Sequence, residues 1–418
     1  MIVKKSNMRI LFISLGTQGD IEPFLARATL LHKEGHVITC LFPKQFKTLV
    51  TELGFHFYGF DSRFLDLLNT DFGKGFLGSK GNFLTRATNF IRLMMASFSL
   101  QSTLINQQKK AIHELNPDLV FFHPKAIYCL LPAQVNPTKF IQLSPVPCIL
   151  HGHQDFPHLG LSKFKPFSTS SNLRTYKLIN QIKYLALWKY LKPHLLNFPK
   201  HSITKKSLAE FEQKELTTWY QISPSLFPKP NYWPENALVT GYLSRHLKEY
   251  FIPDSKLMSW LKKYPKAVLL TFGSMTNHDP EKVTSIILKI LEKHKIPTLI
   301  NLSWGGLVRP QVVSDLFFFV EKIPYDWVLP QLYGIIHHGG SGTTHSAAKA
   351  GAVQLLIPHI MDQYFWNNLV ANLGLGPKGI PISKLQSNSF EKVILDFWNT
   401  EVYKKNAAQM CKKIENEK

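Results

Sequence analysis

Short apolar runs alternate with helix-like segments in two separate parts of the chain, and this pattern limits the fold more than any other feature. In the first part, the run Met8–Ser14 is followed by the turn GTQGD, a helix-like segment at Ile21–His32 and a second apolar run, GHVITCLF. Strands that are apolar on both faces and are joined through helices are typical of parallel sheets. The amino-terminal half is therefore predicted to be α/β.

A second alternation of the same kind begins after the proline-rich stretch Ser223–Asn236. Proline is a poor fit to helices and central strands, so the connection between two halves is expected near this stretch. A chain of 418 residues also exceeds the usual size of one domain. We predict two doubly wound, Rossmann-like domains that face one another, with bounds 1–241 and 253–390, a linker at 242–252 and carboxyl-terminal helices at 391–418.

Positive charge is concentrated in one segment of the chain, which carries a formal net charge of +21. Residues 156–209 contain no Asp or Glu but ten Lys and Arg. Apolar and aromatic side chains follow a helical spacing there, at Leu173, Tyr176, Ile179, Ile182, Leu185, Trp188 and Leu191. A basic amphipathic helix is typical of a membrane surface, so we expect an anionic membrane surface as a partner. Burial of the same face inside its own domain is the alternative.

Other classes of protein are disfavoured by what the sequence lacks. The four cysteines have no CxxC spacing, and no apolar run is long enough to span a bilayer. The apolar stretch near the start is too short for a signal peptide, and translation could start at Met1 or Met8. We expect a cytoplasmic protein, peripheral on the membrane, without nucleic acid as a partner, because no recognised nucleic-acid-binding motif is present.

The segment HHGGSGTT, at residues 337–344, follows an apolar strand-like run and precedes an alanine-rich helix-like segment. Metal binding by His337 and His338 is disfavoured, because adjacent residues on a strand point to opposite sides and no further ligand has a suitable spacing. Glycines that admit a close ligand, followed by hydroxyls at a helix amino terminus, favour a phosphate site. A tight turn and helix cap without a ligand is the alternative.

Asp362 and Gln363 follow the next apolar run, VQLLIP, at the edge where open α/β sheets bind ligands. A carboxylate beside an amide both accepts and donates hydrogen bonds, which suits the vicinal hydroxyls of a sugar. The alternative is that Asp362 only caps the following helix.

The long segment from PYDWVLPQLYGIIHHGG to VANLGLGP resembles the donor-binding region of GT-B glycosyltransferases, and is most similar to the sterol glucosyltransferase and macrolide or glycopeptide glycosyltransferase branch. MRILFISLGTQGDIEPF resembles the amino-terminal signature of that family, and LLTFGSM its first donor-domain strand and loop. Residues 55–220 resemble it only in outline. In this fold the carboxyl-terminal helices pass back over the amino-terminal domain.

The resemblance implies a role for each matching position. Donor-diphosphate contacts are implied for Ser274, His338, Gly340, Ser341, Gly342, Thr343 and Thr344. Asp362 and Gln363 would bind the sugar hydroxyls. Neither a metal nor a cofactor is implied, because helix dipole and hydrogen bonds stabilise the leaving diphosphate. Ser346 stands where plant relatives carry a ribose-binding Glu, which leaves the nucleotide open between UDP and dTDP.

The turn QGDIEP matches the position of the catalytic base, which makes Asp20 the implied base. Burial could raise the pKa of such a carboxylate, and capping of the following helix is the alternative role. We hypothesise that His123, after the strand PDLVFFH, orients Asp20 or shares its proton. Glu22 is a weaker candidate base.

These inferences together predict an inverting glycosyltransferase that moves a hexose, glucose from UDP-glucose in the first instance, to a hydroxyl of a lipophilic molecule such as a sterol or terpenoid. The alternatives are a glycosyltransferase acting on cell-envelope lipids, a sugar-nucleotide epimerase on the same scaffold, and a membrane-surface binding protein without catalysis.

Overall fold

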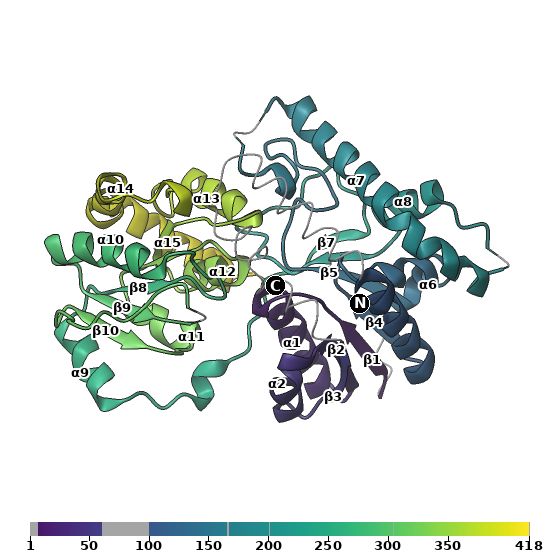
Figure 1. Ribbon diagram of the computed structural model, residues 1–418, viewed down its shortest axis with the longest axis horizontal. Coiled ribbons are helices and arrows are strands. Elements are labelled where there is room, and N and C mark those ends of the chain that lie inside the picture. The colour runs from purple at the N-terminus through teal and green to yellow at the C-terminus, as the bar shows by residue number, and fades with distance from the viewer. Residues whose placement is uncertain (1–6, 61–99, 165–166, 200, 304, 418) are drawn as a thin grey trace. The chain divides into compact units, whose positions relative to one another are not determined.

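The computed structural model describes residues 7–60, 100–164, 167–199, 201–303 and 305–417 (Figure 1). The chain divides into two compact units between Arg245 and His246. Each unit consists of a parallel sheet with helices, which confirms the predicted α/β class. The bounds 1–241, 242–252, 253–390 and 391–418, and the return of the last helices toward the amino-terminal domain, stay predictions.

The first unit contains a seven-stranded parallel sheet in the order β3-β2-β1-β4-β5-β6-β7. Its strands are β1 (Arg9–Ile13), β2 (Val37–Pro43), β3 (His56–Phe60), β4 (Leu119–Phe122), β5 (Phe140–Ser144), β6 (Thr218–Tyr220) and β7 (Ala237–Val239). Its helices include α1 (Gln18–Lys33), α2 (Lys47–Glu52), α6 (Leu130–Val135), α7 (Thr169–Leu191), α8 (Lys205–Lys214) and a further helix over residues 100–115.

Alternate residues of the central strand β1 enter two different cores. Ile10 and Phe12 pack in one cluster with the apolar face of α1, and the Phe12 ring stacks on Phe121 with centroids 4.9 Å apart. Leu11 and Ile13 point to the other face and pack in a second cluster. Because both faces are buried, the strand is a continuous apolar run rather than an alternating one.

The second unit contains a five-stranded parallel sheet in the order β10-β9-β8-β11-β12. Its strands are β8 (Val268–Thr271), β9 (Thr298–Asn301), β10 (Phe317–Val320), β11 (Gly334–His337) and β12 (Val353–Leu356). Its helices are α9 (Ser255–Lys263), α10 (Pro280–Lys293), α11 (Tyr325–Val328), α12 (Ser341–Lys349), α13 (Asp362–Asn372), α14 (Ser387–Asn399) and α15 (Glu401–Glu415).

The last two helices pack within the second unit. Helix α14 contacts α10, and α15 contacts α12 and β12. The Cys411 thiol donates to the Lys349 carbonyl at the end of α12, over 2.9 Å. None of the helices in the described ranges is long and apolar enough to cross a membrane.

Candidate functional site

The turn that leads into Asp20, in the first turn of α1, and the loop that carries His123 lie side by side at one edge of the first sheet. Strands β1 and β4 are neighbours, with Ile13 opposite Phe122, and both loops leave from their carboxyl ends. The chain order changes direction between these two strands, since β2 follows β1 on one side and β5 follows β4 on the other. Such a switch point is where open α/β sheets bind ligands.

The structure brings Asp20 and His123 together and adds a lysine that the sequence analysis did not name. Oδ1 of Asp20 accepts hydrogen bonds from Nε2 of His123, at 3.2 Å, and from Nζ of Lys125, at 2.8 Å. Oδ2 accepts from the backbone N–H of Thr17, at 2.9 Å, which caps α1. Asp20 therefore serves as a helix cap and as a partner of two side chains, while 19% of its side chain stays exposed.

Gly16 is required for this position of Asp20. Its φ is +135°, and a Cβ atom added there would lie 2.0 Å from Oδ2 of Asp20. Any other residue would be strained and would overlap the carboxylate. The first glycine of the turn LGTQGD indicates in the sequence that another group approaches the backbone closely. The sequence does not show that this group is the Asp20 carboxylate.

The hydrogen bonds of His123 fix which ring nitrogen carries the proton. Nδ1 accepts from the backbone N–H of Lys125, at 3.1 Å, so the neutral ring carries its proton on Nε2 and donates to Asp20. Burial lowers the pKa of His123, and the charge of Lys125 lowers it further, against the opposing effect of Asp20. A neutral His123 orients the carboxylate and does not compete with it for a proton.

The expected rise in the pKa of Asp20 is wrong. Burial does raise the pKa of this carboxyl, but the charge of Lys125 and the hydrogen bond from His123 outweigh burial and hold that pKa well below its ordinary value. Asp20 is therefore an ionised carboxylate at neutral pH.

Glu22 is held in an ion pair of its own. Arg245 donates to both of its carboxylate oxygens, from Nε at 2.6 Å and from the terminal nitrogen at 2.8 Å. The Arg245 side chain is only 9% exposed. This two-point contact ties α1 to the end of the first unit and disfavours Glu22 as a base.

An apolar cavity of about 320 Å³ lies in the first unit, and its wall includes Lys125, the partner of Asp20. Leu15 and Lys125 form one part of its wall, and the inner side of α7 forms another. Its lining residues are Leu15, Gln101, Leu104, Pro124, Lys125, Ile127, Ile149, Leu150, His158, Ile179, Asn180, Lys183, Leu187 and Glu212. We call it the unit 1 cavity; its volume is within the range of sites that hold small organic ligands.

The predicted donor residues follow three adjacent strands of the second sheet. Thr271 of β8 lies opposite His337 of β11, and Leu356 of β12 lies on the other side of His337. Ser274 follows β8, His338 follows β11, and Asp362 with Gln363 follows β12. Strands β8 and β11 flank the switch point of this sheet, so the predicted residues gather at its ligand-binding edge.

His338 lies between two glycines that leave room for its ring. A Cβ atom on Gly273 would be 2.8 Å from the ring, and one on Gly340 would be 2.5 Å from Nε2. Burial lowers the pKa of His338 well below its ordinary value, so the ring is neutral. Its Nδ1 is buried without a hydrogen-bond partner among the described residues. His337 is fully buried, and its Nε2–H donates to Gln354.

The start of α12 is partly exposed, apart from one predicted hydroxyl that is buried. Gly340 is the residue before the helix, and Ser341, Gly342 and Thr343 are partly exposed in its first turn. The Thr344 side chain is buried and its hydroxyl donates to the Gly340 carbonyl, at 3.0 Å. In this geometry Thr344 supports the helix start rather than presenting a hydroxyl to a ligand.

Asp362 and Gln363 begin α13 after a strained residue. Met361 has φ +36°, a conformation that costs a non-glycine residue free energy. The Gln363 amide is 4% exposed and accepts from the backbone N–H groups of His359 and Ile360. Asp362 is partly exposed. Gln363 therefore shapes the loop in this structure, and sugar contacts by both residues stay predictions.

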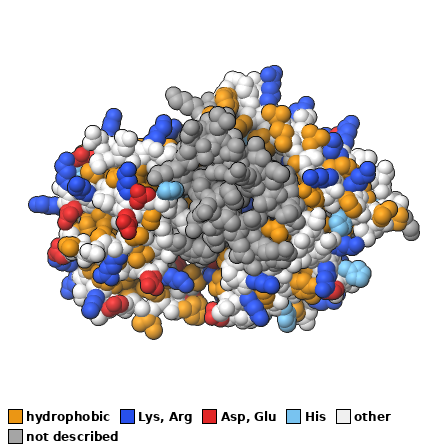
Figure 2. Space-filling view, viewed as in Figure 1, with side chains coloured by type: hydrophobic (Ala, Val, Ile, Leu, Met, Phe, Trp, Pro, Cys, Tyr) orange, Lys and Arg blue, Asp and Glu red, His pale blue; other side chains and the backbone are white. Residues whose placement is uncertain are grey.

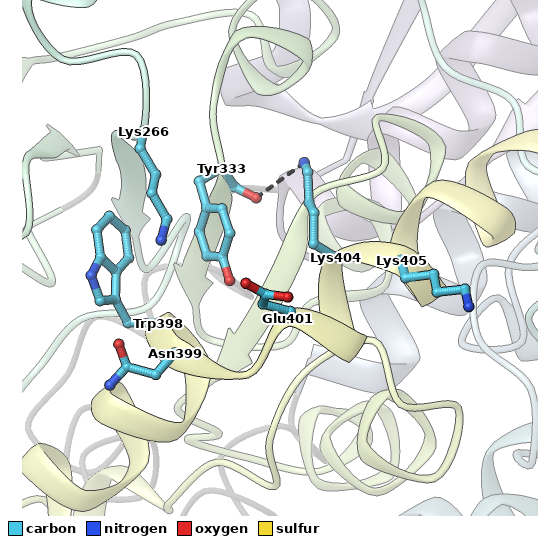
Figure 3. A pocket seen from close by; sticks show the side chains of 7 residues that line it. All are labelled: Lys266, Tyr333, Trp398, Asn399, Glu401, Lys404 and Lys405. Carbon is cyan, nitrogen blue, oxygen red and sulfur yellow. Dashed lines mark hydrogen bonds between the residues drawn. The ribbon is translucent and has the colours of Figure 1, made fainter.

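A second cavity, of about 540 Å³, lies near the amino-terminal ends of β8 and β11 (Figure 3). It is lined by Lys266, Tyr333, Trp398, Asn399, Glu401, Lys404 and Lys405. Lys266 lies over the Trp398 ring, and Lys404 donates to the carbonyls of Tyr333 and Gly351. It contains none of the predicted residues. Over the residues that the structure describes, no cluster of three or more His, Cys, Asp or Glu could hold a metal.

Helix α7 exposes a row of apolar side chains to solvent. Leu178, Ile182 and Leu185 are 55%, 54% and 63% exposed, and we call them the outer stripe of α7. Hydrophobic and basic side chains are intermixed over the face that carries α7 (Figure 2). The residues predicted to form one apolar face do not share one environment: Tyr176 and Leu191 are buried, whereas Ile182 and Leu185 are exposed.

The chain is similar in sequence to known proteins. Residues 309–417 match the family model of the erythromycin biosynthesis protein CIII-like C-terminal domain. A sterol 3-beta-glucosyltransferase of Arabidopsis thaliana is 28% identical over 419 residues, which cover 98% of this chain but 63% of that protein. The chain thus spans less than two thirds of the length of this relative.

Two solved structures have a similar fold. The glycosyltransferase of kitacinnamycin superposes with a TM-score of 0.70 at 15% identity, covering 98% of this chain and 95% of that one. The glycosyltransferase VinC, solved in complex with dTDP, superposes with a TM-score of 0.65 at 16% identity, covering 98% and 96%.

Proposed function

Since the chain belongs to the UDP-glycosyltransferase superfamily, in its sterol glucosyltransferase branch, and has the GT-B fold, we propose that it transfers a hexose from a nucleotide sugar to a hydroxyl of a lipophilic molecule with inversion. The observation that carries this proposal is the Asp20 carboxylate, partly exposed at a sheet switch point and adjacent to the wall of an apolar cavity.

Asp20 is the proposed base. As the acceptor oxygen attacks the anomeric carbon, the new carbon–oxygen bond forms, the bond to the donor phosphate breaks, and the hydroxyl proton passes to Asp20. Lys125 and His123 position the carboxylate and keep it ionised before the proton arrives. Attack opposite the leaving group inverts the configuration of the sugar.

The start of α12 is the proposed site of the donor diphosphate. Backbone N–H groups at a helix amino terminus favour anions, and the buried Nδ1 of His338 supplies a further polar atom at the same edge. Asp362 is the proposed sugar contact. UDP-glucose is the first donor to test; dTDP-glucose is the second, because a similar glycosyltransferase was solved with dTDP.

We also propose that the protein acts on the cytoplasmic face of a membrane, as a peripheral protein. The outer stripe of α7 lies within residues 156–209, the segment with ten basic and no acidic residues. Exposed apolar side chains among cations suit an anionic lipid surface. The four cysteines are free thiols, which agrees with a reducing compartment.

The deciding experiment measures products. Purified protein is mixed with UDP-glucose or dTDP-glucose and a panel of lipid alcohols, and new glycosides are sought by mass spectrometry, with D20N as the inactive control. A lipid glycoside with inverted configuration supports the proposal. A changed free sugar nucleotide would point to an epimerase, products only from polyprenyl-linked lipids would point to cell-envelope synthesis, and vesicle binding without turnover would point to a non-catalytic protein.

A further inference from the structure

Helices α7 and α8 together place a charged pair in the wall of the unit 1 cavity. Lys183 and Glu212, from α7 and α8, both line the cavity and form a salt bridge. The Glu212 side chain is 1% exposed, whereas 26% of the Lys183 side chain is exposed. Most of the other lining residues are apolar, and the remaining polar ones are Gln101, Lys125, His158 and Asn180.

Both carboxylate oxygens of Glu212 already accept hydrogen bonds, and the side chain is almost fully buried. Oε1 accepts from Nε2 of Gln142, at 3.0 Å, and Oε2 accepts from both Lys183 and the Tyr184 hydroxyl. His158, which also lines the cavity, is likewise occupied: Nε2 donates to the Ile149 carbonyl and Nδ1 accepts from the Gly160 N–H.

Lys183 differs from these two residues. Its ammonium group has three N–H donors, and among the described residues its one hydrogen bond is to Glu212. A ligand that fills the cavity with hydrocarbon alone would remove water from the remaining donors without replacing it, which is unfavourable. A ligand oxygen at this place would satisfy them.

We propose that Lys183 Nζ binds a second oxygen of the acceptor, a neutral hydroxyl or carbonyl, and so selects lipophilic alcohols that carry two oxygen functions. This inference rests on the proposed glycosyl transfer, with the first hydroxyl beside Asp20. The oxygen is neutral because Glu212 already balances the charge of Lys183, and a ligand carboxylate would meet the negative charge of Glu212 in an apolar wall.

A purely structural role for Lys183 gives a different expectation. If the lysine only neutralised Glu212 and tied α7 to α8, its loss would affect every acceptor alike. The recognition role affects acceptors with a second oxygen and spares those without one, so paired acceptors separate the two roles.

The test uses the full chain and two sterols with the same skeleton. One has a single hydroxyl, and the other has a further hydroxyl or ketone at the far end of the ring system. Equilibrium binding of each sterol is measured by fluorescence or calorimetry, and KM by glycoside formation. The wild-type protein is expected to bind the second sterol about tenfold more tightly or better.

The double variant K183M/E212Q removes both charges and avoids an unpaired buried carboxylate. We expect it to lose the preference, because binding of the two-oxygen sterol weakens about tenfold more than binding of the single-hydroxyl sterol. Equal wild-type binding of the two sterols would overturn the inference, as would an equal loss for both in the variant. Selective binding without any glycoside would overturn the proposed transfer and leave the Lys183 contact standing.

Discussion

Lys125 Nζ lies 2.8 Å from Oδ1 of Asp20, and this contact sets the protonation state of the carboxylate. Burial acts to raise the pKa of Asp20, and Lys125 is the largest opposing influence. In K125M, burial is opposed by His123 and the Thr17 N–H but no longer by Lys125, and the pKa of Asp20 rises. Because the base must be ionised, activity is lost as pH falls through this pKa, and the acidic limb of kcat/KM moves to higher pH.

The measurement is kcat/KM for both proteins from neutral pH down to the lowest pH at which each stays folded, with unfolding monitored at each pH. K125R is the matched control. Because it keeps the positive charge, its acidic limb of kcat/KM is expected to match that of the wild-type protein. An unchanged acidic limb in K125M would contradict the role given to Lys125.

The two acidic residues of the turn are expected to respond in opposite ways. D20N removes the proposed base, and turnover falls by about 100-fold to 10,000-fold. E22Q breaks one ion pair, so it lowers the free energy of unfolding by about 1 to 3 kcal/mol while turnover stays within about twofold. Initial rates and urea unfolding give both quantities. Loss of turnover in E22Q with retention in D20N would reverse the assignment.

His123 is expected to act through the position of Asp20. In H123A the carboxylate loses one of its donors, and kcat falls about tenfold to 100-fold with little change in the KM for donor. In H123Q the side-chain amide supplies an N–H in place of Nε2–H and recovers part of the rate. Full turnover in H123A would show that the hydrogen bond to Asp20 has no role in catalysis.

Gly340 is expected to be required for donor binding. Its φ of −66° and ψ of +144° suit alanine, so G340A introduces no backbone strain. The added Cβ would lie 2.5 Å from Nε2 of His338 and displace that ring. We expect the KM for the nucleotide sugar to rise about tenfold while the KM for the acceptor is unchanged. An unaltered donor KM would remove His338 from the donor site.

The outer stripe of α7 is expected to control attachment to anionic lipid. L178S/I182S/L185S should weaken binding to phosphatidylserine-containing vesicles by about tenfold or more. In a separate measurement, high salt should weaken vesicle binding by the wild-type protein. The triple variant I252S/V312S/V402S also loses three exposed apolar side chains, but in the second unit, and serves as the control. Equal vesicle binding by the two variants would place the membrane contact elsewhere.

The loops of the site were predictable because each follows a buried strand. Asp20, His123, Ser274, His338 and Asp362 all come shortly after apolar runs, and the carboxyl ends of neighbouring parallel strands meet at one edge. Direct contact of Asp20 with His123 could only be hypothesised, since it depends on which strands are neighbours. Lys125 was missed because one lysine on a loop has no distinguishing pattern in sequence.

The orientation of α7 could not be obtained from apolar spacing. Its buried side includes Asn172, Asn180 and Tyr184, whose polar atoms bond to the Gln154 and Leu150 carbonyls and to Glu212. These partners lie in other segments, so the sequence cannot show that polar residues face inward and leucines outward. The role of Gln363 was likewise not visible in the sequence, because its amide oxygen accepts hydrogen bonds from backbone N–H groups of the preceding loop.

The carboxylate of Asp20 also caps α1, through the N–H of Thr17. Replacement by histidine, another side chain that can act as a general base, would remove that cap and leave a larger ring against Gly16. An attempt to convert one kind of catalyst into the other in the laboratory would therefore have to rebuild the start of this helix first. The choice of base at this position is therefore constrained by a folding role of the same side chain.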